Sequence, residues 1–243
     1  MKTNKFIIPA VLFFGLAFLA SCDKDSGPLK GEGPVIEQVF VLPTVTSVGL
    51  NIDANVVLTH GETEEVIIKG QENIIDNIEK YVNADGYWNI NYDRNVRSHA
   101  GVTIYITSPY LDYISVSGSG SVNSVNIFPD STNVILKISG SGNISFSTLA
   151  LLAESDISGS GEIYLSGNSD EHRINISGSG NVRAFDFLTK TTKVKISGSG
   201  YSEVFVEELL DVDISGSGDV YYKGYPQILS DISGSGGIHN SNK

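Results

Sequence analysis

In the second half of the chain, apolar and polar residues alternate around a phrase, Ser-Gly-Ser-Gly, that occurs seven times. The residue before each phrase is valine or isoleucine, and the residue before that one is polar. An apolar residue also stands two places after the phrase in six of the seven copies. Alternation of this kind is typical of a strand with one buried face. The phrase therefore marks a corner between two strands.

The regular spacing of the phrase predicts a solenoid. The copies begin at Ser117, Ser139, Ser158, Ser177, Ser197, Ser215 and Ser233, at intervals of 18 to 22 residues. One such unit cannot bury its own apolar face, but stacked units form a continuous core. We therefore predict an all-β fold, a parallel β-helix of about seven coils. In the fifth copy Ser202 replaces the apolar residue and Val204 resumes the pattern, which predicts a bulge or register shift there.

Glycine is expected at the corners because a sharp turn often needs a positive φ, which glycine adopts without steric cost. The predicted corner residues are Gly118, Gly140, Gly159, Gly178, Gly198, Gly216 and Gly234. Other uses of such a phrase fit less well. A flexible linker would lack the flanking β-branched residues, a phosphate-binding loop would need a following lysine and helix, and a calcium β-roll has a nine-residue repeat.

The segment 35–116 contains further β-branched and aromatic runs, such as VIEQVFVL and VTIYITS, which predict strands. One stretch differs: ENIIDNIEKYV places its apolar residues on one helical face, so a short helix is predicted over 72–82. We read 35–116 as the N-terminal β-rich part of the solenoid and 117–243 as the repeat.

The first 21 residues predict a lipoprotein signal peptide. Lys2 and Lys5 precede an apolar run that is too short for a membrane span of about 20 residues. The junction Leu-Ala-Ser-Cys then resembles a bacterial lipobox, which would make Cys22, the only cysteine, the site of lipid attachment. The alternative is an ordinary signal peptide beside an unrelated cysteine. Residues 22–34 are polar and rich in glycine and proline, as in a flexible tether.

Charge argues against a nucleic-acid partner. Removal of residues 1–21 takes away Lys2 and Lys5 and no acid, which leaves 14 basic against 28 acidic residues, a net charge of −14. A field of that sign repels polyanions.

The SGSG coils, together with the preceding stretch VTIYITSPYLDYISVSGSGSV, resemble the putative auto-transporter adhesin head (GIN) domain family of Bacteroidetes secreted lipoproteins. The resemblance covers roughly Phe40 to the C-terminus. It implies a right-handed β-helix and a role in adhesion at the cell envelope, on an outer-membrane lipoprotein that is surface-exposed or periplasmic. That family offers no catalytic residues to transfer.

Two classes of function remain. The first is a non-catalytic, lipid-anchored envelope protein that binds an unknown surface glycan or protein. The second is a carbohydrate-active β-helix enzyme, of polysaccharide lyase or hydrolase type. The four histidines share no repeat position, and no metal-ligand spacing or nucleotide loop occurs. The sequence therefore predicts no enzyme, cofactor, metal site or catalytic residue. Asp213 and Asp231 occupy adjacent coils and could hold a cation, or could be solvated beside Lys195.

Four tyrosines mark a candidate ligand or oligomer surface: Tyr201, Tyr221, Tyr222 and Tyr225. Exposed tyrosines stack on sugar rings, but they also cover sheet faces or fill subunit contacts. Ser131, in Asp-Ser-Thr, resembles the O-glycosylation acceptor of Bacteroidetes secreted proteins. After the last phrase only GIHNSNK remains. Either this tail folds across the last coil, or the C-terminal coils form a homo-oligomer.

Overall fold

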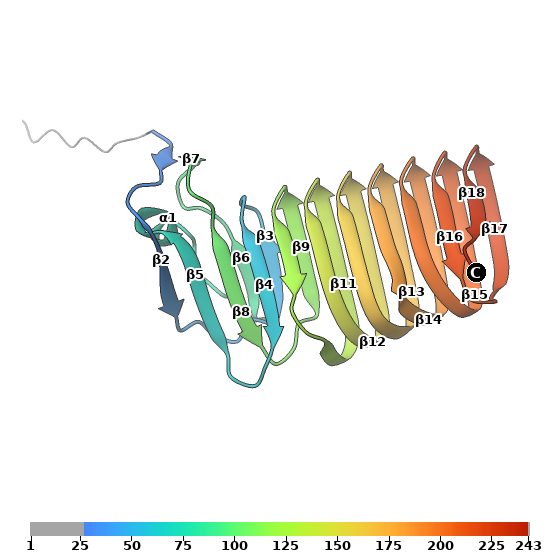
Figure 1. Cartoon of the computed structure of the whole chain (residues 1–243), viewed down its shortest axis with the longest axis horizontal. Coiled ribbons are helices and arrows are strands. Elements are labelled where there is room, and N and C mark those ends of the chain that lie inside the picture. The colour runs from blue at the N-terminus through green and yellow to red at the C-terminus, as the bar shows by residue number, and fades with distance from the viewer. Residues whose placement is uncertain (1–26, 243) are drawn as a thin grey trace, which may run out of the picture.

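Strands form nearly all of the regular structure, as the β-branched pattern predicts. The computed structural model describes residues 27–242, in which successive coils stack side by side into an elongated parallel β-solenoid (Figure 1). The predicted parallel β-helix is confirmed. The predicted signal peptide 1–21 and the predicted lipid-attachment residue Cys22 lie outside the described residues. In the described part of the chain, no helix has the length and apolar character needed to span a membrane.

The N-terminal part contains eight strands and one helix. They are β1 (Leu29–Lys30), β2 (Val35–Phe40), β3 (Ser47–Leu50), β4 (Asn55–His60), β5 (Glu65–Gln71), α1 (Glu72–Asp76), β6 (Tyr87–Ile90), β7 (Val96–Ser98) and β8 (Thr103–Ser108). The repeat contains β9 (Tyr113–Gly118), β10 (Ser121–Ser124), β11 (Phe128–Gly140), β12 (Asn143–Gly159), β13 (Glu162–Gly178), β14 (Asn181–Gly198), β15 (Tyr201–Gly216), β16 (Asp219–Lys223), β17 (Gln227–Gly234) and β18 (Gly237–Asn240).

Each coil of the repeat has two faces that meet at the Ser-Gly-Ser-Gly corner. We call the stretches just before each corner, such as residues 136–140, the leading face, and those just after it, such as residues 143–147, the trailing face. Equivalent residues of neighbouring coils pair in parallel register, so Ile138 lies beside Ile157, and Ile157 beside Ile176. The inward row before the corner is buried from Val116 to Ile214. Each such side chain contributes roughly 1.5–3 kcal/mol to stability when fully buried.

The two glycines of the phrase are required for different structural reasons. The first adopts the left-handed region in every corner, with φ between 116° at Gly118 and 139° at Gly234. The second lies outside that region but packs against the previous coil. A Cβ atom on Gly161 would lie 2.5 Å from the carbonyl oxygen of Gly142 and 2.6 Å from Cγ2 of Ile138. Both positions therefore exclude side chains.

Main-chain hydrogen bonds join each corner to the previous one. The amide of Ser160 donates to the carbonyl of Gly140 at 2.8 Å, and the amide of Ser179 donates to the carbonyl of Gly159 at 2.9 Å. In the described corners, the hydroxyl–hydroxyl bond that we find joins Ser217 and Ser235, at 3.0 Å. The corner is thus held by its backbone more than by the serine hydroxyls.

The predicted irregularity at Ser202 is wrong in its position. Ser202 pairs in register with Val182 and Val220 and is fully buried. The register shifts after Ala184 instead, on β14. The reason is coil length: the copy that begins at Ser177 is 20 residues long and the next is 18. The two extra residues of the longer coil are accommodated near the bend between the faces, and Ser202 keeps its place in the row.

The N-terminal coils stack in an order that differs from their order in the sequence. The strand pair β3–β4 lies between β6–β8 on one side and β9–β10 on the other, with parallel pairing throughout. Beyond β8 the sheet continues with β5 and then β2, both antiparallel to their neighbours. This end of the solenoid therefore finishes in antiparallel strands next to α1 (Figure 1).

The predicted helix is shorter than the expected range 72–82. It ends at Asp76, and Ile78 and Val82 form isolated bridges with Tyr92 and Trp88. Asn77 explains the end of the helix. Its side-chain amide donates to the carbonyl of Arg94 and accepts from the amide of the same residue, at 2.8 and 3.1 Å. These bonds fix the chain to a neighbouring loop, and the four apolar residues of the segment are buried without a continuous helix.

Candidate functional site

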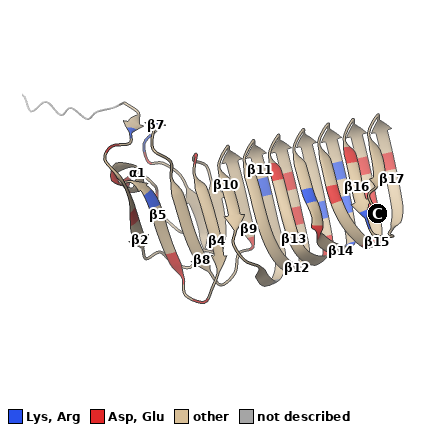
Figure 2. Cartoon of the chain, viewed as in Figure 1, with Lys and Arg blue, Asp and Glu red and all other residues tan. Residues whose placement is uncertain are grey.

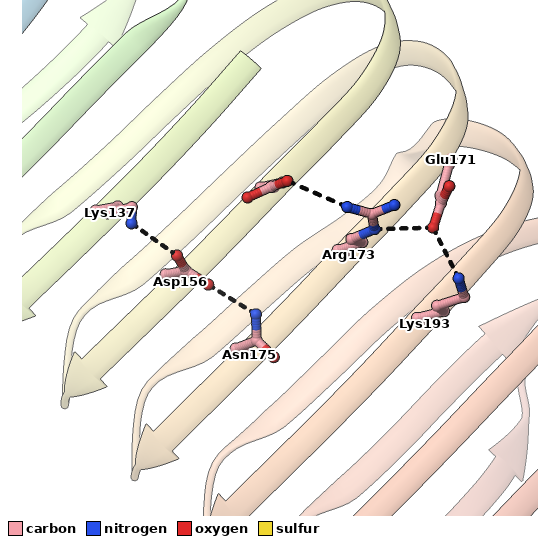
Figure 3. A network of polar contacts seen from close by, with 7 residues as sticks. Lys137, Asp156, Glu171, Arg173, Asn175 and Lys193 are labelled. Carbon is pink, nitrogen blue, oxygen red and sulfur yellow. Dashed lines mark hydrogen bonds and ion pairs between the residues drawn. The ribbon is translucent and has the colours of Figure 1, made fainter. Parts of the chain in front are cut away.

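The leading face carries a ladder of alternating charges. Figure 2 shows Lys and Arg interspersed with Asp and Glu over β11 to β15. In the row next to the inward isoleucines, Lys137 lies 3.3 Å from Asp156, and the amide of Asn175 donates to the same carboxylate at 2.8 Å (Figure 3). These residues come from three successive coils because their spacing in the sequence equals the coil length.

A second charged row lies beside the first. Arg173 donates to Glu171 at 2.9 Å and lies 3.5 Å from Glu154, while Lys193 donates to Glu171 at 3.1 Å (Figure 3). The hydrogen bond from Arg173, followed by that from Lys193, lowers the pKa of Glu171. These pairs are partly exposed, so each contributes little to stability. Their main effect is to neutralise the leading face.

Asp213 and Asp231 occupy paired positions on adjacent coils, as the sequence predicts. Lys195 lies 3.3 Å from Asp213, which matches the solvated, lysine-paired alternative. Across residues 27–242, no cluster of three or more His, Cys, Asp and Glu side chains has the geometry of a metal site.

The trailing face carries a different feature, a continuous band of aromatic and cationic side chains from two adjacent rows. We call Tyr164, Arg183, Tyr201, Tyr221 and His239 the aromatic stripe. The guanidinium of Arg183 lies 5.5 Å from the ring centre of Tyr164 and 5.4 Å from that of Tyr201. Tyr201 meets Tyr221 edge to face at 6.1 Å. Tyr221 stacks on His239 at 4.9 Å. The stripe therefore crosses five successive coils without a break.

Carboxylates hold the stripe in place at both ends. Glu162 accepts from the hydroxyl of Tyr164 at 2.7 Å and from Arg183 at 3.2 Å. The hydrogen bond from Tyr164 is the main cause that lowers the pKa of Glu162. At the other end, Asp219 lies 2.9 Å from Nε2 of His239. These contacts restrict the rotamers of the side chains in the stripe.

The four predicted tyrosines do not form one surface in the structure. Tyr201 and Tyr221 lie in the stripe. Tyr222 points the other way, packs against the core and accepts a hydrogen bond from Asn240. Tyr225 is 88% exposed in the loop before β17. The sequence analysis missed Tyr164, Arg183 and His239. A signal was present, because Tyr164, Arg183, Tyr221 and His239 each stand three residues after the last glycine of a phrase.

The four histidines are separate in the structure, and each has its own aromatic neighbour. His60 contacts Phe128, His99 contacts Tyr92, and His239 contacts Tyr221. The fourth, His172, is buried in the core, where it contacts Phe187 edge to face and bonds to Ser155 at 2.9 Å. Burial lowers its pKa to about 3, so it is a neutral core residue at physiological pH.

The predicted glycosylation site is also located. Ser131 lies in β11, beside Ala150 of the next coil, and is half-buried. Ser131 lines a surface hollow together with Thr132, Leu151 and Asn168. The predicted lipid-attachment residue, Cys22, precedes the first described residue.

Solved structures share this fold over almost their entire length. A crystal structure of a putative adhesin from Bacteroides fragilis NCTC 9343 is 24% identical, with a TM-score of 0.80, and the match covers 87% of this chain and 99% of that one. A putative adhesin from Parabacteroides distasonis ATCC 8503 is 20% identical, with a TM-score of 0.73 and coverage of 88% and 100%. A putative lipid binding protein from the same organism is 22% identical, with a TM-score of 0.73 and coverage of 89% and 100%.

No curated protein matches the chain significantly. A family profile does: "Putative auto-transporter adhesin, head GIN domain" matches residues 45–226, which is well over half of the sequence. This range begins before β3 and ends after β16, so it includes both the N-terminal coils and most of the repeat. The chain therefore belongs to the family of putative auto-transporter adhesin head (GIN) domains.

Proposed function

We propose that this protein is a lipid-anchored, non-catalytic adhesin of the cell envelope that binds glycan chains through the aromatic stripe. Membership of an adhesin family supports a role in surface contact. The leader and the lipobox-like junction before Cys22 support export and anchoring by lipid. Several acyl chains on one cysteine bind a membrane more firmly than the single chain that gives only marginal attachment.

The observation that carries the glycan assignment is the continuity of the stripe across five coils. Sugar rings have an apolar face of C–H groups, which packs on aromatic rings, and hydroxyls that bond to charged neighbours. Tyr164, Tyr201 and Tyr221 supply rings, while Arg183 and Glu162 supply polar partners beside them. The stripe advances by one coil, about 4.8 Å, from each residue to the next, although Tyr201 lies one row closer to the corner than the others, so a repeating ligand can contact each coil in turn. A net charge of −14 on the mature chain favours neutral glycans over anionic ones.

Two observations favour binding over catalysis. On the leading face, where an enzyme of the β-helix type would need free acids and a base, most of the carboxylates are paired with Lys, Arg or Asn. In the stripe, the carboxylates of Glu162 and Asp219 are likewise paired, with Arg183 and His239. Turnover of a uronate-containing polysaccharide by the purified protein would instead support the enzyme hypothesis.

The test is binding of the mature protein to an array of neutral polysaccharides, followed by measurement of affinity for the best ligand. Tyr201→Ala together with Tyr221→Ala is expected to weaken binding at least about tenfold, because two stacked rings are lost. Tyr225→Ala is the matched control, since that side chain is more exposed than either but lies off the stripe. Unchanged affinity in the double variant, with an intact fold by circular dichroism, would exclude the stripe as the binding surface.

Anchoring has a separate test. Cys22→Ala is expected to release the protein from the membrane fraction, because the sequence offers no other lipid-attachment cysteine. Fractionation of cells that express the wild type and the variant measures this directly. A variant that stays membrane-bound in the absence of detergent would contradict lipid anchoring at Cys22.

A further inference from the structure

A surface hollow of about 640 Å³ lies on the leading face, where the N-terminal coils meet the repeat. Its walls come from β3, β6, β9, β11 and the loops before β6 and β9. The lining residues are Ser47, Asn83, Asp85, Tyr87, Asp112, Tyr113, Asn133 and Ile135. The hollow is separate from the aromatic stripe, which lies on the trailing face, and the sequence analysis did not identify it.

Ser47 on β3 forms its floor. Ser47 pairs with Tyr87 on one side and with Tyr113 on the other. Because serine is short, the two rings approach each other over it, with centres 6.0 Å apart and planes at 76°. The next outward residue on β3 is Gly49, where any side chain would collide with the hydroxyl of Tyr87. The out-of-order stacking of the coils thus places two tyrosines on either side of a strand whose outward residues, Ser47 and Gly49, are small.

Polar side chains line most of the rest of the hollow, and local hydrogen bonds fix Asn83 and Asp112. Asn83 accepts from the amides of Asp85 and Tyr87 at 3.0 and 2.9 Å, which holds that loop in a tight turn. Asp112 accepts from the hydroxyl of Ser47 at 2.8 Å. The Oδ1 atom of Asn133 is buried and has no hydrogen-bond partner within residues 27–242. A buried acceptor without a donor costs free energy unless a ligand or water supplies one.

We infer that this hollow binds one neutral hexopyranose unit. The tyrosine pair offers aromatic surface to the C–H face of the sugar, and the carboxylates of Asp85 and Asp112 accept hydrogen bonds from its hydroxyls. No lysine or arginine is among the residues that line the hollow, so an anionic sugar meets two carboxylates and no compensating cation. The volume lies within the range of small-molecule sites.

This inference deepens the proposed glycan-binding function, but it concerns a different face and a smaller ligand. The probes are methyl glycosides of glucose, galactose, mannose and N-acetylglucosamine, with methyl glucuronide as the anionic comparison. Saturation-transfer NMR on the mature protein reports which of them bind, and titration gives the affinity. We expect saturable binding of at least one neutral glycoside and none of the glucuronide.

Two variants locate the binding. Tyr113→Ala removes one aromatic wall, and Ser47→Leu fills the floor. Each is expected to weaken binding of the neutral glycoside at least about tenfold. Tyr81→Ala is the control, because that ring is 75% exposed and lies outside the hollow. The inference is overturned if no neutral glycoside binds, if the glucuronide binds equally well, or if both variants bind as the wild type does. Calcium binding without any sugar binding would also overturn it.

The experiments distinguish failure of the hollow proposal from failure of the stripe proposal. If Tyr201→Ala and Tyr221→Ala abolish binding of polysaccharide while no methyl glycoside binds, the hollow is excluded and the stripe stands. If a methyl glycoside binds and Tyr113→Ala abolishes this, while the stripe variants leave polysaccharide binding intact, the hollow stands and the stripe is excluded.

Discussion

At the scale of single residues, the corner glycines allow the coils to stack, because their positive φ and their contact with the previous coil leave no place for a side chain. Gly178 combines a φ of 119° with close approach to the previous coil, where an added Cβ would lie 2.6 Å from the carbonyl oxygen of Gly159. Ser179 next to it contributes mainly its backbone amide, which bonds to the same carbonyl. The two residues of one phrase therefore tolerate substitution very differently.

We predict that Gly178→Val destabilises the protein far more than Ser179→Ala. Strain at a left-handed position alone costs about 1–3 kcal/mol, and the clash adds to it. Gly161→Ala should also destabilise, although its φ is ordinary, because its Cβ would meet Gly142 and Ile138. Thermal melting of the three variants measures this. Equal melting temperatures for Gly178→Val and Ser179→Ala would show that the phrase is not a stacked corner.

His172 predicts a dependence of stability on pH. Its pKa is about 3 in the folded state, because it is buried, and about 6.5 when unfolded. Below pH 6.5 the unfolded chain binds a proton that the folded chain does not, so stability is complete above 6.5 and decreases as the pH falls toward 3. Because of His172, the free energy of unfolding should fall by about 2 kcal/mol between pH 7 and pH 5.

Urea denaturation of wild type and His172→Leu at the two pH values isolates that contribution. The loss of stability on acidification should be about 2 kcal/mol smaller in the variant. The same loss in His172→Leu as in the wild type would contradict the assignment.

At the scale of strands, the inward row just after the corners is apolar except at Ser202, and this exception is informative. Its side chain is fully buried, its hydroxyl has no partner in the described chain, and its row neighbours are Val182 and Val220. A buried hydroxyl without a hydrogen bond is unfavourable. Both neighbouring coils accommodate a valine at the equivalent position of this row.

We therefore expect Ser202→Val to stabilise the protein by about 1–2 kcal/mol, because it removes the unpaired hydroxyl and adds buried apolar surface. Val182→Ser, the reverse change one coil earlier, should destabilise it. Chemical denaturation of both variants provides the measurement. A lower free energy of unfolding in Ser202→Val would mean that the row is too tightly packed at this coil.

At the scale of the whole molecule, the two ends of the solenoid differ. The N-terminal end finishes with antiparallel strands and α1. At the C-terminal end, β17 pairs with β15 on one side only and is exposed along its whole length. Ile232, which continues the buried isoleucine row, is 38% exposed there. The residues up to Asn242 run beside β16, where Asn242 bonds to Gly224, and leave β17 uncovered.

An uncovered strand edge with apolar residues promotes association. We predict that the mature protein forms a dimer through its C-terminal coils at high concentration. A two-fold axis at Ser230 would pair Ile228 with Ile232 across the contact and keep the two Asp231 side chains apart. Light scattering should report a dimer for the wild type and a monomer for Ile228→Lys combined with Ile232→Lys. Val41→Lys, at a fully exposed position elsewhere, is the control. A monomeric wild type would exclude the association.

The sequence by itself determined the repeat, its inward rows and the corners, because these depend on neighbours at a fixed distance along the chain. Once coil length is constant, a residue such as Ile157 can only lie beside Ile138 and Ile176. Tertiary structure alone decided the N-terminal half, where β3–β4 lies between coils that follow it in the sequence, and where Ile78 and Val82 are buried without a helix. It also decided the sites. Tyr221 and Tyr222 are adjacent in the sequence, but the strand directs one outward and one into the core. Tyr87 and Tyr113 are far apart in the sequence, and they meet because the outward residue of the strand between them is the small Ser47.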